Sequence, residues 1–106
     1  MTSVTENGAG TVLTVTFTKP VYDYDGGGYE PDDPAEWYYY DADGDVEIVS
    51  VTLSANHKVA TVTLSGPAGE GDIIVAGDFH SIDMSCFGTP NAAERDGSGN
   101  WTLTTY

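Results

Sequence analysis

The sequence VEIVSVTLSANHKVATVTLS, residues 46–65, decides the fold of this chain. In its first half, Val49, Val51 and Leu53 are two residues apart, with polar residues between them. In its second half, Val62 and Leu64 repeat this spacing. Because successive side chains of a β-strand point to opposite faces, each half is predicted to be a strand with one buried and one exposed face.

A short polar segment, SANHK at residues 54–58, separates the two halves. Asn56 within it tolerates the positive φ angle that tight turns require. Residues 46–65 are therefore predicted to form a β-hairpin. The apolar face of this hairpin requires a second sheet to cover it.

Other segments of the chain resemble this hairpin in pattern. In TVLTVTFT, residues 11–18, the side chains of Leu13, Val15 and Phe17 are predicted to face inward, with threonines on the outside. Further strands are predicted at residues 3–5, 37–40, 72–76 and 101–105. Residues 91–95, in contrast, are predicted to be a loop.

The composition agrees with an all-β fold. Thr, Val, Tyr and Gly are abundant, and no window shows a sustained helical periodicity. A chain of 106 residues fits one domain with one modest core. We therefore predict a single β-sandwich of about seven antiparallel strands over residues 1–106.

The chain is strongly acidic, with 17 Asp and Glu residues against 3 Lys and Arg residues and a formal net charge of -14. This charge argues against nucleic acid and anionic membrane surfaces as partners. No apolar run approaches the ~20 residues of a membrane span, so no membrane insertion is expected. Cys86 is the only cysteine, which excludes an internal disulfide.

Three segments, in this order along the chain, resemble a known family. TVLTVTFTKPV, residues 11–21, looks like the opening strand of the bacterial Ig-like domains found in surface-layer and secreted multidomain proteins. Residues 46–77 are similar to the next block of that family: strand, polar turn, strand, glycine-containing loop and strand. DGSGN, residues 96–100, stands where that family has a loop before its last strand.

The resemblance implies an Ig-like β-sandwich in a non-catalytic spacer or adhesion unit. It also implies an extracellular or cell-surface location, with neighbouring domains of a parent polypeptide as partners. Residues 1–106 are expected to be one domain excised from a larger secreted protein, with its signal peptide outside this sequence. The chain departs from the family at residues 21–36 and 79–95, and any function particular to it is expected there. Within the second departure, residues 78–84 fit a short strand or a helical turn.

An acidic band between residues 23 and 47 is the first candidate site. Calcium takes six to eight oxygen ligands, and Asp residues at alternate positions place their carboxylates on one side. The predicted Ca²⁺ ligands are Asp41, Asp43, Asp45 and Glu47. The segment fails the EF-hand pattern because Thr52 stands at the twelfth position, where a bidentate Glu is required. The alternative is a tight turn at Asp43-Gly44 with solvated acids.

A cluster of aromatic residues is the second candidate site. Exposed Tyr and Trp rings present apolar area with a polar group, which suits stacking on sugars and contacts with proteins. In a strand at residues 37–40, Trp37 and Tyr39 share one face and Tyr38 and Tyr40 the other. The predicted ligand-binding residues are Trp37, Tyr38, Tyr40, Tyr24 and Tyr29. The alternative is that the loop at residues 21–36 packs on these rings and covers them.

Weaker candidates complete the sequence reading. Cys86 with His80 and Asp83 invites a thiol-hydrolase interpretation, but no base or oxyanion donor is evident nearby. Lys19 and Lys58 are poor candidates for an intramolecular amide bond, since that chemistry needs a buried lysine. We therefore predict no enzymatic activity. Two alternatives to a spacer remain open: a carbohydrate-binding module, and a self-assembling surface or filament subunit whose partner is another copy of the chain.

Overall fold

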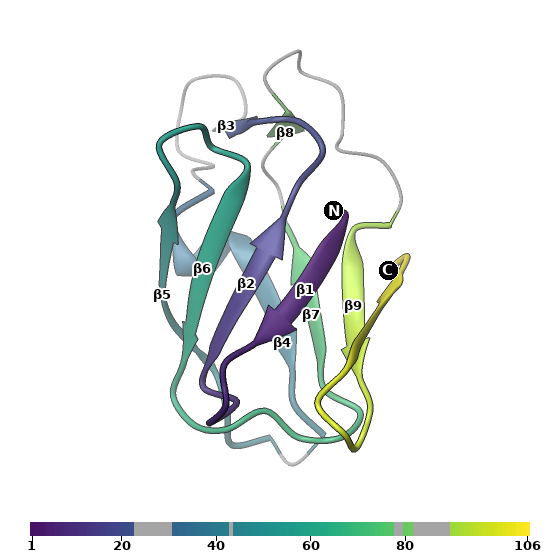
Figure 1. The fold of residues 1–106 in the computed structure, drawn as a ribbon. Coiled ribbons are helices and arrows are strands. Elements are labelled where there is room, and N and C mark those ends of the chain that lie inside the picture. The colour runs from purple at the N-terminus through teal and green to yellow at the C-terminus, as the bar shows by residue number, and fades with distance from the viewer. Residues whose placement is uncertain (23–30, 43, 78–79, 82–89) are drawn as a thin grey trace.

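The computed structural model describes residues 1–22, 31–42, 44–77, 80–81 and 90–106, and it shows two four-stranded antiparallel sheets packed face to face (Figure 1). The first sheet has the order β1-β2-β6-β5 and consists of β1 (Ser3–Glu6), β2 (Val12–Thr16), β6 (Val59–Leu64) and β5 (Ile48–Leu53). The second sheet has the order β10-β9-β7-β4 and consists of β10 (Trp101–Thr104), β9 (Ala92–Arg95), β7 (Ile73–Ala76) and β4 (Trp37–Tyr40). The predicted all-β sandwich is confirmed, with eight strands in these two sheets rather than seven.

The first sheet follows the alternation of its sequence. Leu13 and Val15 of β2 are fully buried, as is Val62 of β6, and the threonines between them lie on the other face. Leu13 is the direct neighbour of Val62 across the β2–β6 pair. The predicted hairpin at residues 46–65 is confirmed as β5 and β6. Its inner face supplies one half of the core.

The predicted inward position of Val49 is wrong. The β5–β6 pairing shifts between Ile48, which pairs with Leu64, and Ser50, which pairs with Thr63. Val49 is therefore the extra residue of a β-bulge, and its side chain is 58% exposed. Val51 beyond the bulge is buried. One added residue changes which face the side chains on either side of it point to. Val49 and Val51 are two residues apart, but the bulge places them on opposite faces.

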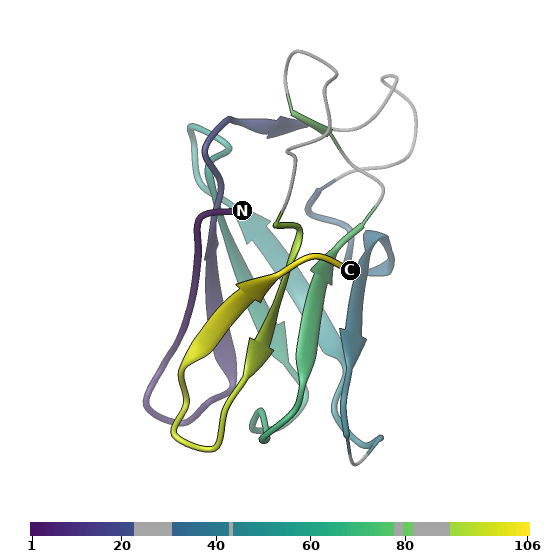
Figure 2. The ribbon, with the colours of Figure 1, turned by 90° about the vertical axis from the view of Figure 1, so that its right-hand side faces the viewer.

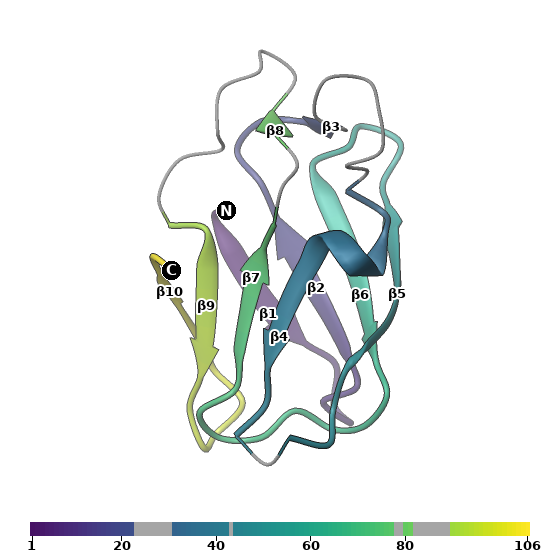
Figure 3. The same ribbon diagram turned by 180° about the vertical axis from the view of Figure 1, so that it is seen from behind.

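The prediction of a loop at residues 91–95 is also wrong. Residues 92–95 form β9, which pairs with both β7 and β10 and so lies inside the second sheet (Figure 3). Ala92 and Ala93 are fully buried. Alanine is depleted in strands on average, because it offers little side chain to pack, and the sequence therefore gave no strand signal here.

Three short elements lie outside the two sheets. β3 (Val21–Tyr22) and β8 (His80–Ser81) pair with each other, which settles this part of residues 78–84 as strand. The 3₁₀ helix η1 (Pro34–Glu36) directly precedes β4, and its N-cap Asp33 accepts a hydrogen bond from the backbone N–H of Ala35 at 3.0 Å. All three elements fall within residues 21–36 and 79–95, the two segments that depart from the family pattern the sequence resembles.

The turn of the central hairpin differs in detail from the prediction. His57, rather than Asn56, has the positive φ angle, 59°. The Asn56 carboxamide oxygen accepts from the backbone N–H of Lys58 at 3.1 Å and from the Ser54 hydroxyl at 2.6 Å. His57 is half-buried, and its Nδ1 lies 3.0 Å from the carbonyl oxygen of Val21. His57 therefore links the hairpin turn to β3.

The core lies between the two sheets, which are seen edge-on in Figure 2. Phe17 packs against Trp37 across this space, with ring centroids 6.1 Å apart and an interplanar angle of 59°. On one side of the sandwich β1 lies against β10. Both ends of the chain lie on this side (Figures 1 and 2). No helix among the described residues is long and apolar enough to cross a membrane.

Candidate functional site

Three tyrosines form the most distinctive surface, which we call the tyrosine face. Tyr38 and Tyr40 share one face of β4, as alternation predicts, and this face points away from the core, with the two side chains 43% and 45% exposed. Tyr38 pairs with Val75 of β7, and Val75 pairs in turn with Ala92 of β9. Val75 and Ala92 thus share this outer face, yet both are buried. Buried apolar side chains therefore lie beside Tyr38 on the outer face of the second sheet. Tyr106 is the third tyrosine of this face, and its ring stacks against Tyr40.

Tyr106 is held on this face by its backbone as well as its ring. Its backbone N–H donates to Oδ1 of Asn91 at 2.8 Å, and its carbonyl oxygen accepts from Nδ2 of Asn91 at 3.2 Å. Its ring centroid lies 5.0 Å from that of Tyr40, at an interplanar angle of 27°. Loss of hydration and the nearby Tyr106 raise the pKa of Tyr40. No pattern in the sequence places Tyr106 in this site, because only the fold brings it to β4.

Trp37, in contrast, cannot belong to an exposed ligand surface. Its side chain is 4% exposed and belongs to the core. The indole Nε1 donates to the carbonyl oxygen of Pro31 at 2.7 Å, which satisfies the one polar atom of the buried ring. The prediction that Trp37 shares a face with Tyr39 is confirmed, and that face is the inner one. Tyr24 and Tyr29 lie outside the described residues.

The predicted calcium ligands lie on the connection between β4 and β5. Oδ2 of Asp41 accepts from the backbone N–H groups of Asp45 at 2.9 Å and Val46 at 2.6 Å, so this carboxylate closes a turn. Asp45 and Glu47 are exposed, and Asp43 lies outside the described residues. Within the described part of the chain, no three His, Cys, Asp or Glu side chains are grouped to hold a metal ion.

Two surface hollows accompany these features. One, of about 220 Å³, lies between the edge strands β4 and β5 and is lined by Pro34, Trp37, Tyr39, Glu47 and Ile48. It brings Glu47 of the acidic band next to the aromatic strand. The other, of about 320 Å³, is lined by Glu70, Gly71, Glu94, Arg95, Asp96 and Thr102. Both hollows are shallow.

A buried carboxylate ties the end of β4 to the loop before β7. Asp72 is 1% exposed. Its Oδ2 accepts from the Tyr39 hydroxyl at 2.7 Å and from the backbone N–H of Gly69 at 2.8 Å, and its Oδ1 accepts from the backbone N–H of Ala42 at 3.2 Å. Burial, followed by the hydrogen bond to Asp72, raises the pKa of Tyr39 far above its usual range. These contacts give Asp72 a structural role, because its polar atoms are satisfied inside the fold.

An ion pair connects the two sheets on the side where β1 meets β10. Arg95 of β9 donates from Nε and Nη2 to the two carboxylate oxygens of Glu6 on β1, at 2.7 and 3.1 Å. Trp101 Nε1 adds a hydrogen bond to Glu6 Oε1 at 2.8 Å. The hydrogen bond from Arg95 is the main reason that the pKa of Glu6 is lowered, and Glu6 in turn raises the pKa of Arg95. We call Glu6, Arg95 and Trp101 the sheet clamp.

The turn before β10 resembles the Asp41 turn in its construction. Oδ1 of Asp96 accepts from the backbone N–H groups of Ser98 at 2.8 Å and Asn100 at 3.0 Å, and these bonds lower the pKa of Asp96. Gly99 supplies the positive φ angle of 91° that the turn requires. Residues 96–100, which resemble a loop of the bacterial Ig-like family in sequence, thus form a tight turn between β9 and β10.

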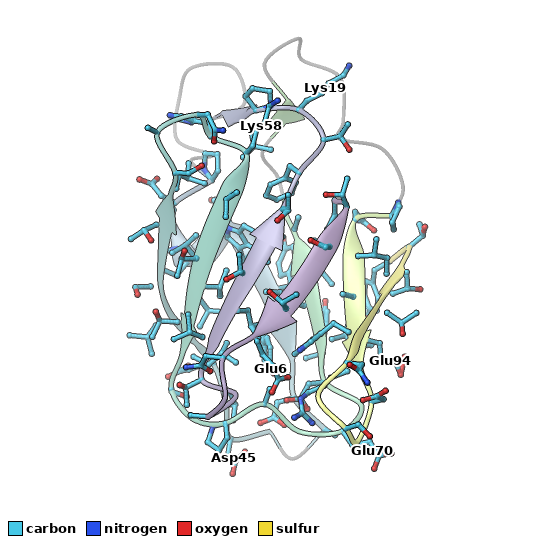
Figure 4. All side chains as sticks on the ribbon, in the orientation of Figure 1. Glu6, Lys19, Asp45, Lys58, Glu70 and Glu94 are labelled. Atoms are coloured by element: carbon cyan, nitrogen blue, oxygen red, sulfur yellow. The ribbon has the colours of Figure 1, made fainter. Side chains whose placement is uncertain are left out.

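The weaker candidates gain nothing from the structure. Lys19 and Lys58 lie exposed at one end of the molecule, far from Asp45 and Glu70 at the other end (Figure 4). Neither lysine has the buried setting that an intramolecular amide bond needs. Cys86, Asp83 and the side chain of His80 lie outside the described residues.

Comparison with known proteins gives one informative match. No protein-family model and no curated protein sequence matches the chain. Among solved structures, the fold is similar to the crystal structure of the N-terminal part of the bacterial S-layer protein SbsC, with a TM-score of 0.56 and 18% sequence identity. The match covers 97% of this chain and 32% of that chain. The chain is therefore similar in fold to a segment of a larger protein, about one third of its length.

Proposed function

We propose that this chain is a non-catalytic structural module of a bacterial cell-surface protein, acting as a spacer or adhesion unit beside neighbouring domains. The observation that supports the proposal is the fold match over 97% of the chain to part of an S-layer protein. Asp72 and the sheet clamp use their polar groups for bonds inside the fold, which suits a structural module. Calcium stabilisation of the acidic band stays a prediction.

Labelling of whole cells tests the location that this function requires. Antibodies raised against the folded chain are applied to intact and to lysed cells of the source organism, together with an antibody against a cytosolic marker. The proposal expects binding to intact cells, with the marker detected only after lysis. Binding of the chain-specific antibody only after lysis would contradict a cell-surface role.

The tyrosine face favours a second function, binding of a neutral glycan. Tyr38 and Tyr40 expose ring area beside each other on one sheet face, and the net charge of -14 disfavours anionic ligands. Retention on insoluble neutral polysaccharides, measured for the native chain and for Tyr38→Ala, tests this function. The expected result is retention that Tyr38→Ala lowers and that Thr52→Ala, an exposed change on the other sheet, leaves unchanged. Equal retention of the native chain, Tyr38→Ala and Thr52→Ala would contradict glycan binding by the tyrosine face.

Self-association stays the third possibility, and the edges of the sheets are where it is expected. In the order β1-β2-β6-β5, strand β5 is an edge, and its exposed Val49 sits at a bulge. Bulges commonly protect edge strands from pairing with other chains. Light scattering over a range of protein concentrations distinguishes the cases, since self-assembly predicts a mass that rises with concentration.

A further inference from the structure

Tyr40 and Tyr106 come from opposite edges of one sheet and still meet. Tyr40 is on β4, and Tyr106 follows β10, while β9 and β7 separate these strands in the order β10-β9-β7-β4. Neighbouring strands are ~4.8 Å apart, so Tyr106 must reach across the outer faces of β9 and β7 to contact Tyr40. The two hydrogen bonds to Asn91 fix the backbone in the position that allows this reach. The ring pair is therefore a product of the fold.

Both rings are accessible while they touch. Tyr40 is 45% exposed and Tyr106 is 61% exposed, and their centroids are 5.0 Å apart in a stacked arrangement. The hydroxyl of Tyr106 is also close enough to perturb that of Tyr40. Tyr39 is different: its side chain is half-buried, and its hydroxyl donates to the buried Asp72. A small oxidant thus reaches both phenols of the stacked pair, and a radical formed on one ring meets the other before it meets another molecule.

We propose that Tyr40 and Tyr106 are a modification site, at which a peroxidase acting with hydrogen peroxide joins the two rings by an intramolecular dityrosine bond. Each phenol gives up one electron and one proton, forming two phenoxyl radicals. The radicals couple through the ring carbons next to the oxygens, and the hydrogens on these two carbons move to the oxygens, restoring both phenols. The two electrons and two protons reduce one hydrogen peroxide to two molecules of water.

The bond would fasten the end of the chain that follows β10 to the opposite edge strand. β10 pairs only with β9 within its sheet. A covalent link from Tyr106 to Tyr40 of β4 would keep β10 from peeling away from β9 at the Tyr106 side. It would also close the unfolded chain into a loop between the two tyrosines. The cross-linked form should therefore melt at a higher temperature than the untreated form.

Treatment of dilute protein with a haem peroxidase and hydrogen peroxide tests the proposal. The expected product is a monomer that has lost two hydrogen atoms in mass and shows dityrosine fluorescence. Cleavage after Asp and Glu should release residues 37–41 and 97–106 as one joined peptide, which mass spectrometry identifies. A product consisting mainly of covalent dimers, or a joined peptide lacking either segment, would overturn the proposal.

Three phenylalanine variants assign the bond to particular rings. Tyr40→Phe and Tyr106→Phe keep the ring but cannot form the phenoxyl radical, so each should lower the yield of cross-linked monomer to background. Tyr38→Phe is the matched control on the same strand face and should keep the native yield. Thermal melts of the untreated variants verify that all three fold. A native yield from Tyr106→Phe would overturn the assignment.

Discussion

At the scale of single residues, Gly77 shows how closely two segments of this fold approach. A Cβ atom at Gly77 would overlap the backbone carbonyl oxygen of Glu36, at the end of η1. Backbone atoms cannot turn aside as a flexible side chain can, so only glycine fits between β7 and η1. The sequence alone gives no reason to prefer this glycine over the others.

Gly77→Ala is therefore expected to destabilise the protein by about 1–3 kcal/mol or more, as overpacking does. Gly8→Ala is the matched control, because nothing lies within 4 Å of its added Cβ, and it should change stability by at most ~0.5 kcal/mol. Urea denaturation of both variants gives the free energies of unfolding. Equal values for the two variants would show that Gly77 and Glu36 do not approach in this way.

At the scale of strands, the bulge in β5 separates two valines that look equivalent in sequence. Val49 and Val51 share a parity, yet Val49 is 58% exposed and Val51 is 6% exposed. Val51→Ala is expected to cost about 1–3 kcal/mol through lost burial and a residual cavity. Val49→Ala should cost about 0.5 kcal/mol or less, as is usual for surface positions. Similar losses measured by urea denaturation would restore the uninterrupted alternation that the sequence suggests.

How far the strands could be predicted from sequence depends on which physical signal each one carries. β2, β6 and β7 have clear apolar patterns, and the prediction located all three. β9 carries no such pattern, because its two buried residues are consecutive alanines that point to opposite faces of the sheet. For the candidate site, alternation put Tyr38 and Tyr40 on one face of the strand and Tyr39 on the other, but it did not decide which face enters the core. The contact with Tyr106 and the pairing of Glu6 with Arg95 join residues far apart in sequence, and no local pattern predicts them.

At the scale of the whole molecule, the sheet clamp joins the two layers on the β1–β10 side, and its strength should depend on pH. The pKa of Glu6 is lowered in the folded state, chiefly by Arg95, from an ordinary value of 4.5. The unfolded state therefore takes up the proton first as pH falls. The stabilisation by Glu6 is present above pH 4.5 and is lost as pH falls from there through the folded-state pKa.

Glu6→Gln should consequently lower stability at pH 7 by about 1–3 kcal/mol, since it weakens a charged hydrogen-bond network. The difference from the native chain should shrink as pH falls below 4.5. Glu94→Gln is the control, an exposed change on β9 that should have a small effect at either pH. Denaturant titrations at pH 7 and below pH 4.5 measure the differences in the free energy of unfolding between each variant and the native chain. A constant Glu6→Gln effect across pH would contradict the clamp.

Calcium binding would affect the whole molecule, because a bound cation would relieve repulsion in a chain with a net charge of -14. We expect millimolar calcium to raise the melting temperature relative to EDTA. Sodium chloride at matched ionic strength controls for screening, and Glu47→Gln tests whether Glu47 is a ligand. An equal midpoint in calcium and in matched sodium would remove calcium from the account.

The module and its tyrosine face both depend on two four-stranded sheets that enclose one core, with β9 inside the second sheet. Native-state hydrogen exchange followed by NMR tests this arrangement. Interior strands exchange through the rarest openings, so the backbone amides of Ala93 and Glu94 should be protected as strongly as those of Val62 and Ile74. Rapid exchange throughout residues 92–95 would make this segment a loop and contradict the structure described here.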